Sequence, residues 1–356
     1  MQTAFQRAAP SVHLIEDGEI RPNIGLALMG GGSWGIFTAG ALEEILPHLE
    51  RIGQITDISA TSAGSVNGAL VASGLHDDGA YEAVRRLGAG WGRIRQDGWM
   101  KQFPHIFTDL MLPPEDKWPN FPSAYFNVMA GMQAGMQMIN PLGSSLATQY
   151  ISNLVRDMVP DWKSVQNGRV KLSANTVRCH VLTRKQEHVI LSGQNLTPDG
   201  IAASAALKEL GTHRIRDLPN ARDAWNELDY TYLDGGYAEN PPLSPLINAD
   251  ITDLVAIILH DHNHKPLKQM VSKGGKLKHD EIHTDIAGLA LDDSNRIRLH
   301  AIQIDMADGA INGWHLNDSS KMNTDPEFLD AMRAAGREAG QKWLRDNFPY
   351  FLEGST

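Results

Sequence analysis

Short apolar segments of β type alternate with helical segments along most of this 356-residue chain. Alternation of this kind is typical of a largely parallel sheet covered by helices. The segments that predict strands are 24–29, 55–60, 170–174, 179–183, 188–191, 230–233, 254–260 and 299–304. The segments that predict helices are 35–49, 64–73, 81–94, 146–159, 200–207 and 326–347. We therefore expect the α/β fold class with a mostly parallel central sheet.

The last predicted helix has a clear beginning and a clear apolar face. Asp325 can cap it, and Pro326 suits its first turn. Apolar side chains recur on one face at helical spacing, namely Phe328, Met332, Ala335, Ala339 and Trp343. This periodicity indicates core packing, and we assign residues 311–356 to a C-terminal helical extension packed on the core.

Changes in composition divide the rest of the chain. Residues 1–22 form an irregular lead-in, and residues 23–310 form the predicted main domain. Two segments interrupt the alternating pattern of this domain. Residues 96–145 are dense in aromatic, Pro and Met side chains, and we interpret them as an insertion over one end of the sheet. Residues 265–280 contain five lysines and are predicted to form an exposed loop.

Charge, cysteine content and hydropathy restrict the partners and the compartment of the protein. The formal net charge is −10, and affinity for nucleic acid depends on clustered Lys and Arg, so nucleic acid is not an expected partner. Cys179 is the one cysteine, and the N-terminus lacks the apolar core of a signal peptide. No run reaches the ~18 continuous apolar residues of a membrane span. We expect a cytoplasmic protein with, at most, peripheral contact to a membrane or lipid surface.

Three consecutive glycines, Gly30, Gly31 and Gly32, stand between the first predicted strand and the first predicted helix. Glycines leave backbone N–H groups unobstructed, and such amides bind negative charge. The ligand could be a nucleotide phosphate or the oxyanion of an acyl-transfer reaction. The run GGGSWG fits the dinucleotide pattern G-x-G-x-x-G, which calls for an acidic residue closing a second strand about twenty residues later. That distance falls inside the helical run EEILPHLER, which weakens the dinucleotide interpretation.

A second joint between strand and helix, ISATSAGSVNGAL, carries Ser62 among small residues. A strand, a sharp turn and a helix are typical of a nucleophile elbow, where a serine oxygen stands above the sheet and the helix N-terminus favours anionic charge. The usual pattern is G-x-S-x-G, and Ala60 takes the place of its first glycine. Taken alone, a serine in such a turn is more often structural than catalytic.

A third joint, YLDGGYAENPP, places Asp234 at the end of a strand-like run. Asp-Gly is common in ordinary β-turns, and this is the simpler interpretation of the segment by itself. The functional interpretation is a carboxylate at the carboxyl end of a strand, where open α/β sheets bind their ligands. Such a carboxylate can accept the proton of a nearby serine hydroxyl and make the oxygen a nucleophile.

Taken together, the three joints resemble the patatin-like phospholipase family. The pattern of that family is G-G-G-x-[KR]-G, then G-x-S-x-G, then D-G-[GA]. This sequence has GGGSWG at residues 30–35, ATSAG at 60–64 and DGG at 234–236, in the same order. The resemblance covers roughly residues 24–245 and implies a three-layer α/β/α sandwich.

The resemblance also implies the chemistry of the site, that of a serine lipid acyl hydrolase of the phospholipase A or carboxylic ester hydrolase type, with no cofactor and no metal. Ser62 and Asp234 would form a catalytic dyad without histidine, and the reaction would pass through an acyl-enzyme intermediate. The oxyanion hole would be built from Gly30, Gly31, Gly32 and Ser33. The supporting motif positions would be Trp34, Gly35, Ala60, Ala63, Gly64, Gly235 and Gly236. The substrate would be a lipid or another acyl ester.

Two positions depart from the family pattern. Trp34 stands where the family carries Lys or Arg, and Ala60 replaces a glycine. Neither departure removes a reacting group. The tryptophan can change how the protein binds an anionic head group, and the alanine can alter the backbone geometry of the elbow. Two alternatives remain on the same scaffold, namely an acyltransferase and a non-catalytic lipid-binding protein.

Histidines offer a rival site after the predicted strand 254–260. His260, His262 and His264 follow Ser62 and Asp234 in the order of an α/β-hydrolase triad. Imidazole and carboxylate are also good metal ligands, but no H-x-x-x-H helix or partner cluster accompanies these histidines. In the α/β-hydrolase fold the nucleophile elbow lies deeper in the sheet, whereas Ser62 follows the second strand of this chain. The dyad is therefore favoured over the triad.

The dyad predicts that alanine at each of these three histidines leaves ester hydrolysis unchanged, because no histidine moves a proton in the reaction. Steady-state hydrolysis of a short-chain ester by the three single variants is the measurement. Complete loss of hydrolysis at one position would identify a triad instead. Loss of hydrolysis in the presence of a strong chelator would identify a metal site.

Overall fold

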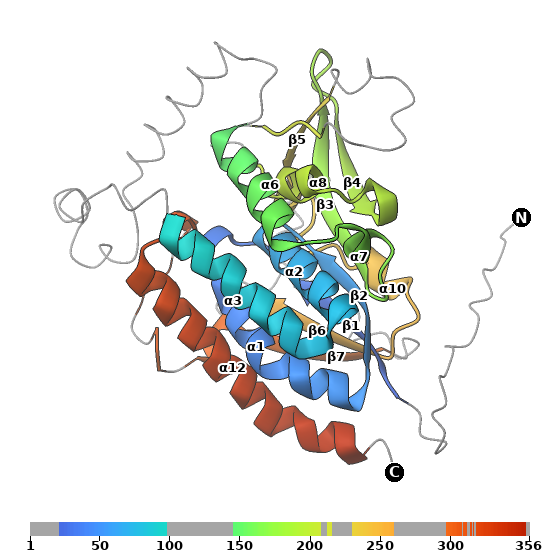
Figure 1. Ribbon diagram of the computed structural model, residues 1–356, viewed down its shortest axis with the longest axis vertical. Helices are drawn as coiled ribbons and strands as arrows, with labels where there is room; N and C mark the ends of the chain where they lie inside the picture. Colours follow the sequence, from blue (N-terminus) through green and yellow to red (C-terminus); the bar gives the residue numbers. More distant parts are fainter. Residues whose placement is uncertain are drawn as a thin grey trace, which may run out of the picture.

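A mostly parallel sheet forms the centre of the molecule (Figure 1). The structure is a computed structural model and describes residues 21–97, 145–207, 212–215, 230–259, 297–307, 309–311, 314, 316 and 318–353. The strands in these ranges are β1 (Asn23–Leu28), β2 (Gln54–Ala60), β3 (Lys171–His180), β4 (Gln186–Ser192), β5 (Tyr230–Asp234), β6 (Asp253–Ile258) and β7 (Arg298–Gln303). Their order is β4-β3-β2-β1-β6-β7, with β5 paired to β3. Only the pairs that β3 makes with β4 and β5 are antiparallel in the described part of the sheet.

The strand β3 corrects one prediction. Residues 170–174 and 179–183 were expected to form two strands, and the structure has a single strand over Lys171–His180. Asn175 and Thr176, which lie between the two predicted strands, are fully buried. Their side chains are hydrogen bonded, as where Thr176 Oγ1 donates to the Leu233 carbonyl at 2.7 Å. Buried polar groups with partners are compatible with the interior of a strand.

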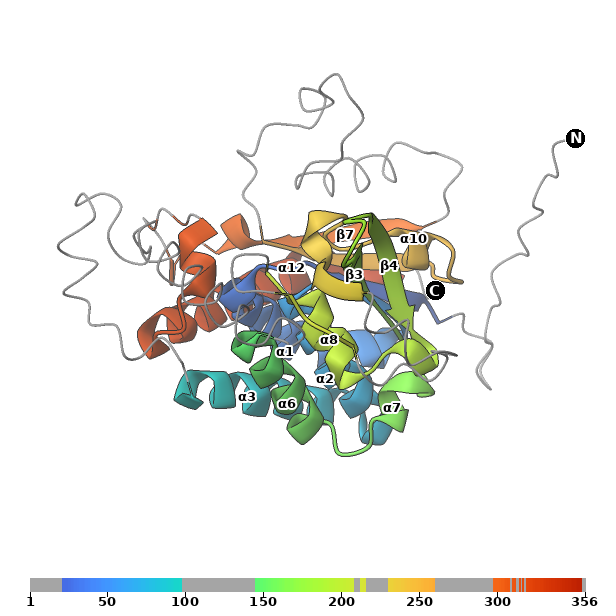
Figure 2. The same ribbon diagram turned by 90° about the horizontal axis from the view of Figure 1, so that it is seen from above.

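Most of the helices lie on one face of the sheet (Figure 2). The longer ones are α1 (Gly35–Ile52), α2 (Ala63–Asp77), α3 (Gly79–Asp97), α6 (Leu146–Met158) and α12 (Pro326–Glu353). The short ones are α7 (Lys163–Gln166), α8 (Pro198–Ser204) and α10 (Ser244–Ile247). Single 3₁₀ turns are η1 (Gly32–Trp34), η3 (Gly193–Asn195), η5 (Gly235–Tyr237), η7 (Ile304–Met306) and η8 (Asp318–Met322).

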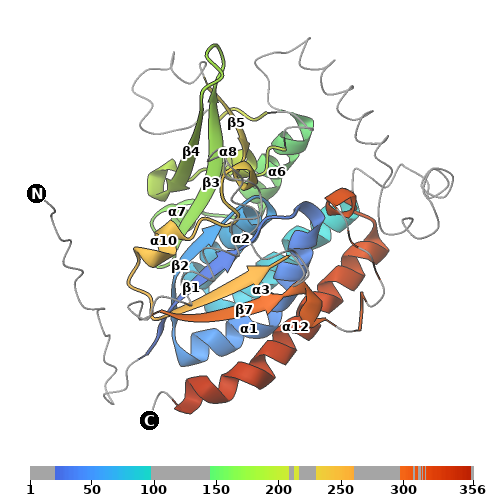
Figure 3. The same cartoon turned by 180° about the vertical axis from the view of Figure 1, so that it is seen from behind.

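The two faces of the sheet are covered differently. On the face of α2, a Cβ on Gly68 would lie 3.3 Å from the side chain of Ile58 and 2.8 Å from that of Leu172, so the helix packs closely on the sheet. On the opposite face, seen in Figure 3, Ser59 Oγ donates to the Pro242 carbonyl just before α10. The predicted α/β class, with a mostly parallel sheet flanked by helices, is confirmed. Most of the predicted lead-in, the insertion at 96–145 and the loop at 265–280 lie outside the described residues.

The C-terminal helix α12 begins and packs as its sequence predicts. The carboxylate of Asp325 accepts a hydrogen bond from the Glu327 amide at 2.8 Å, which caps the helix. The predicted apolar face is buried, comprising Phe328, Met332, Ala335, Ala339 and Trp343. The helix lies along α1, and Glu43 of α1 is paired with Arg333 and Arg337 of α12. α12 is therefore part of the core of the molecule.

Helices α1 and α12 approach each other through glycines. A Cβ atom on Gly336 would lie 2.0 Å from the carbonyl oxygen of Phe37, and one on Gly40 would lie 2.2 Å from that of Arg333. No side chain can occupy such a space without moving one backbone away from the other. The two glycines thus set the distance between the helices.

Gly336→Ala is expected to lower the free energy of unfolding by about 2 kcal/mol, because the added methyl group forces the two backbones apart. Urea denaturation is the measurement. The matched control is Gly92→Ala in α3, where a Cβ would meet nothing within 4 Å. That variant should gain up to about 1 kcal/mol from the better helix propensity of alanine. Equal effects of the two variants would contradict the close approach.

Candidate active site

The candidate nucleophile and its candidate base lie where two strands end facing each other. Strand β2 runs parallel to β3 and ends with Ala60 opposite Ala174. Strand β5 runs antiparallel along the same edge of β3 and ends with Asp234 opposite Thr176. Two residues along a strand span about 6.6 Å. The segment that carries Ser62 and the one that carries Asp234 therefore meet at a narrow gap, beside one residue of β3.

Asn175 is the residue of β3 at this gap, and its side chain connects both segments. Thr61 Oγ1 donates to Asn175 Oδ1 at 2.6 Å. Asn175 Nδ2 donates to the carbonyls of Gly235 at 3.1 Å and Glu239 at 2.7 Å. One buried amide thus holds the residue before Ser62 and the residue after Asp234. None of the three sequence motifs includes Asn175, although a polar pair inside an apolar strand is a usable signal.

Ser62 has the backbone conformation of a nucleophile elbow. Its φ is 54° and its ψ is −125°, and in the described part of the chain Arg184 is the other non-glycine residue with positive φ. Such a conformation costs about 1–3 kcal/mol and persists only where the surroundings enforce it. Here the Ser62 amide donates to Ser204 Oγ at 2.9 Å, and Ser62 directly precedes helix α2. The side chain is 7% exposed, and its oxygen donates to no described residue.

The flanking small residues of the elbow are explained by packing. A Cβ on Gly64 would lie 2.3 Å from the carbonyl oxygen of Leu28, so this motif position accepts only glycine. The methyl group of Ala60 lies 3.6 Å from where a Cβ on Gly68 would stand, which is ordinary van der Waals contact. The alanine that departs from the usual elbow pattern is therefore accommodated beneath α2.

The glycine loop is held in place by Asn240. The Gly30 amide donates to Asn240 Oδ1 at 2.7 Å, and Asn240 Nδ2 donates back to the Gly30 carbonyl at 3.2 Å. The N–H group of Gly30, a predicted oxyanion donor, thus has an acceptor within the protein. The amides of Gly31 and Gly32 donate to no protein acceptor among the described residues.

Two helix N-termini meet beside this loop. Helix α1 begins at Gly35 and helix α2 at Ala63. The two first residues are in contact, since a Cβ on Gly35 would lie 2.7 Å from the Ala63 Cβ. Each helix N-terminus carries a partial positive charge, so their convergence favours an anion at this place.

Asp234 is buried at the end of β5, with 4% of its surface exposed. Its Oδ1 accepts a hydrogen bond from the Gly236 amide at 2.7 Å, and its own amide donates to the Ala206 carbonyl at 2.8 Å. The second glycine of the Asp-Gly-Gly motif thus orients the carboxylate. No direct hydrogen bond joins Ser62 and Asp234 in this structure.

The other predicted site residues lie on the turn η1. Ser33 Oγ donates to the Ser320 carbonyl at 3.0 Å, and Trp34 Nε1 donates to Ser320 Oγ at 2.9 Å. Trp34 is 5% exposed, so the residue at the family's cationic position is a buried, hydrogen-bonded indole. Both side chains therefore fasten the loop to the segment before α12.

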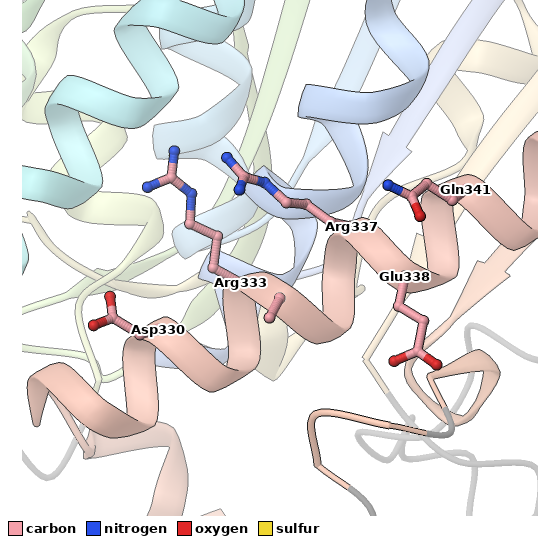
Figure 4. A pocket seen from close by; sticks show the side chains of 6 residues that line it. Asp330, Arg333, Arg337, Glu338 and Gln341 are labelled. Carbon is pink, nitrogen blue, oxygen red and sulfur yellow. The ribbon is translucent and has the colours of Figure 1, made fainter.

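The rival triad and the rival metal site depend on residues that the structure does not describe. The three histidines at positions 260, 262 and 264 lie outside these ranges. Within the described ranges no His, Cys, Asp and Glu side chains group as a metal site, and no helix has the length and hydropathy to cross a membrane. Figure 4 shows a surface pocket of about 390 Å³ along α12, and none of its lining residues belongs to the three motifs. Its Arg333 and Arg337 are paired with Glu43.

Residues 26–163 match the family model described as Patatin-like phospholipase. The matched range includes the glycine loop and Ser62, and Asp234 lies beyond it. The resemblance seen in the motifs is thereby confirmed over this range, and the family is one of lipid-hydrolysing enzymes. A comparison with curated protein sequences finds no significant match.

Solved structures of low sequence identity align with this chain. Human GIVD cytosolic phospholipase A2 is 9% identical with a TM-score of 0.50, and the alignment covers 94% of this chain and 60% of that protein. VipD from Legionella pneumophila is 13% identical with a TM-score of 0.37, covering 94% of this chain and 72% of VipD. The type III effector protein ExoU is 11% identical with a TM-score of 0.29, covering 90% of this chain and 55% of ExoU. At these identities the comparison with the phospholipase A2 speaks for the fold alone.

Replacing Ser62 by glycine is expected to raise the free energy of unfolding by about 1 kcal/mol, because glycine adopts positive φ without strain. Ser62→Ala retains a Cβ atom and should not show this gain. Arg184→Gly, in the β3–β4 turn, is the matched control, since its φ of 59° should give a comparable gain away from the site. Chemical denaturation of the three variants is the measurement. A gain for Ser62→Ala equal to that for Ser62→Gly would contradict strain at the elbow.

Proposed function

We propose that this protein, whose residues 26–163 match the patatin-like phospholipase family, is a serine lipid acyl hydrolase with Ser62 as nucleophile and Asp234 as its base. The main support for the proposal is that β2 and β5 pair with the same edge of β3 and that their carboxyl ends face each other. It brings a strained serine and a buried carboxylate to one gap. Strain of this kind is typical of active sites.

In the proposed reaction, Asp234 accepts the proton of Ser62 while the serine oxygen attacks the carbonyl carbon of an ester. The tetrahedral intermediate collapses, the alcohol leaves with the proton from Asp234, and an acyl-serine remains. A water molecule then gives its proton to Asp234 and attacks the acyl-serine. The carboxylic acid is released when the proton returns to Ser62.

The backbone amides of Gly31 and Gly32 are the proposed donors to the oxyanion. They have no protein acceptor among the described residues, whereas the Gly30 amide is occupied by Asn240. The N-termini of α1 and α2 add favourable partial charge at the same place. One donor of this kind contributes about 3–4 kcal/mol to the transition state, which is a sufficient reason for glycines at the loop.

The dyad requires the side chains of Ser62 and Asp234 to approach when substrate binds. Catalytic hydrogen bonds are often long or absent in an unliganded site and form in the complex with substrate. The backbone on both sides of the gap is already fixed by Asn175. Rotation of the Ser62 side chain is therefore the proposed closing movement.

A fluorophosphonate probe is expected to label the wild-type protein and not Ser62→Ala. Hydrolysis of a short-chain ester should be lost in Ser62→Ala and should fall by about 10²–10⁴-fold in kcat in Asp234→Asn, because that variant lacks a general base. Mass spectrometry of the labelled peptide and steady-state kinetics are the measurements.

The matched controls are Ser192→Ala and Asp330→Asn, two residues on the surface away from the three motifs. Both should keep wild-type labelling and kinetics. A wild-type protein that never labels, in the presence or absence of lipid, would refute the proposal in favour of a non-catalytic lipid-binding protein. An ester product formed with an added alcohol would show that the acyl-serine is used for transfer.

A further inference from the structure

A fully buried side chain of α2, that of Asn67, is hydrogen bonded to both helices beside it. Its Nδ2 donates to the carbonyl oxygen of Gly35, the first residue of α1, at 2.8 Å. Its Oδ1 accepts from Nε1 of Trp91 in α3 at 2.8 Å. The ring of Trp91 packs on the same glycine, because a Cβ on Gly35 would lie 3.1 Å from it. One side-chain amide thus ties the first turn of α1 to α2.

The first turn of α1 is continuous with the glycine loop. The turn η1 leads directly into α1, and the Gly35 amide donates to the carbonyls of Gly32 and Ser33. The Trp34 amide donates to the Gly31 carbonyl at 3.1 Å. A peptide group is planar, so the bond that holds the Gly31 carbonyl also fixes the direction of the Gly32 N–H group. The direction of one proposed oxyanion donor is therefore set by a turn that ends at Gly35.

The candidate nucleophile belongs to the other of the two segments that Asn67 joins. The Ser62 carbonyl accepts a hydrogen bond from the Ser65 amide at 2.9 Å, and α2 continues from there through Asn67. The first residues of α1 and α2 are in contact, which sets their closest approach. The bond from Asn67 to the Gly35 carbonyl holds the helices at that approach.

We propose that Asn67 is a positioning residue for the hydrolysis, which sets the distance between Ser62 and the Gly32 amide. This inference rests on the proposed function and adds a residue outside the three motifs. An oxyanion donor is effective within about 2.7–3.1 Å of the oxygen that becomes charged. A displacement of about 1 Å can lower the rate by about 10²-fold, even when its cause lies far from the reacting atoms. Asn67 thus acts on catalysis through the loop, without contact to substrate.

Asn67→Ala removes the donor to the Gly35 carbonyl. In this variant kcat on a short-chain ester should fall by about 10–10²-fold with KM nearly unchanged, because an oxyanion contact is made in the transition state and not in the ground state. The rate at which a fluorophosphonate labels Ser62 should fall in parallel, because the phosphonyl oxygen of the probe uses the same donors. Steady-state kinetics and the time course of labelling are the measurements.

A second variant, Asn67→Asp, preserves the size of the side chain and the acceptor for Trp91. Its carboxylate cannot donate to the Gly35 carbonyl, so kcat should fall here too. Burial raises the pKa of an introduced carboxyl group, and the protonated form can donate again. The kcat of this variant relative to wild type should therefore rise as the pH falls. A relative kcat that stays constant with pH would overturn the proposal and assign the loss to packing.

Asn23→Ala is the matched control. Asn23 is 8% exposed, and its Nδ2 donates to the Asp250 carbonyl at 2.9 Å, so the same kind of buried donor is lost. Asn23 begins β1, at the end of the sheet opposite Ser62. This variant should keep the kcat and KM of the wild type. Equal losses of kcat in Asn67→Ala and Asn23→Ala would overturn the proposal.

Hydrogen exchange separates this inference from the proposed function, because it needs no turnover. The segment 30–40, which contains η1 and the start of α1, should exchange up to about tenfold faster in Asn67→Ala, the scale of one hydrogen bond. It should exchange at the wild-type rate in Asn23→Ala. Unchanged exchange or unchanged kcat in Asn67→Ala refutes the role of Asn67. Absence of hydrolysis and labelling in the wild type refutes the dyad instead.

Discussion

The candidate site depends on the edge of one strand. Strand β3 pairs with β2 along its first half and with β5 along its second half, on the same side. Because β2 is parallel to β3 and β5 is antiparallel, their carboxyl ends face each other across Asn175. The buried side chain of Asn175 fills this gap and forms hydrogen bonds with polar groups of both segments. Without that interaction the two chain ends would expose unpaired polar groups in the interior, which is costly.

The chemistry of the site follows from what this arrangement leaves available. Ser62 is held at positive φ by its strand, by its helix and by Ser204, so its side chain is directed by the fold. Asn240 accepts from the first amide of the glycine loop, and the next two amides have no acceptor among the described residues. The N-termini of α1 and α2 converge at the same place. These backbone groups favour negative charge at this place.

The C-terminal part of the chain completes the site from a distance. Glycine contacts hold α12 close to α1, and η8, which comes just before α12, lies on the glycine loop. Through this packing Ser320 fixes Trp34, and Lys321 adds a cation to a loop without charge. The buried Trp34 therefore anchors the glycine loop to η8.

The sequence by itself determined the α/β class, the beginning and buried face of α12, and the three joints at Gly30, Ser62 and Asp234. These features have local causes, namely hydrophobic periodicity, capping and glycine at turns, and each can be read from neighbouring residues. Only the tertiary structure decided that β3 is continuous, that Asn240 occupies the Gly30 amide, and that Lys321 reaches Trp34. The last two contacts join residues more than 200 positions apart, as for Gly30 and Asn240, which are 210 apart. Hydrogen bonds and ring contacts of that kind arise from packing and leave no periodic pattern in the sequence.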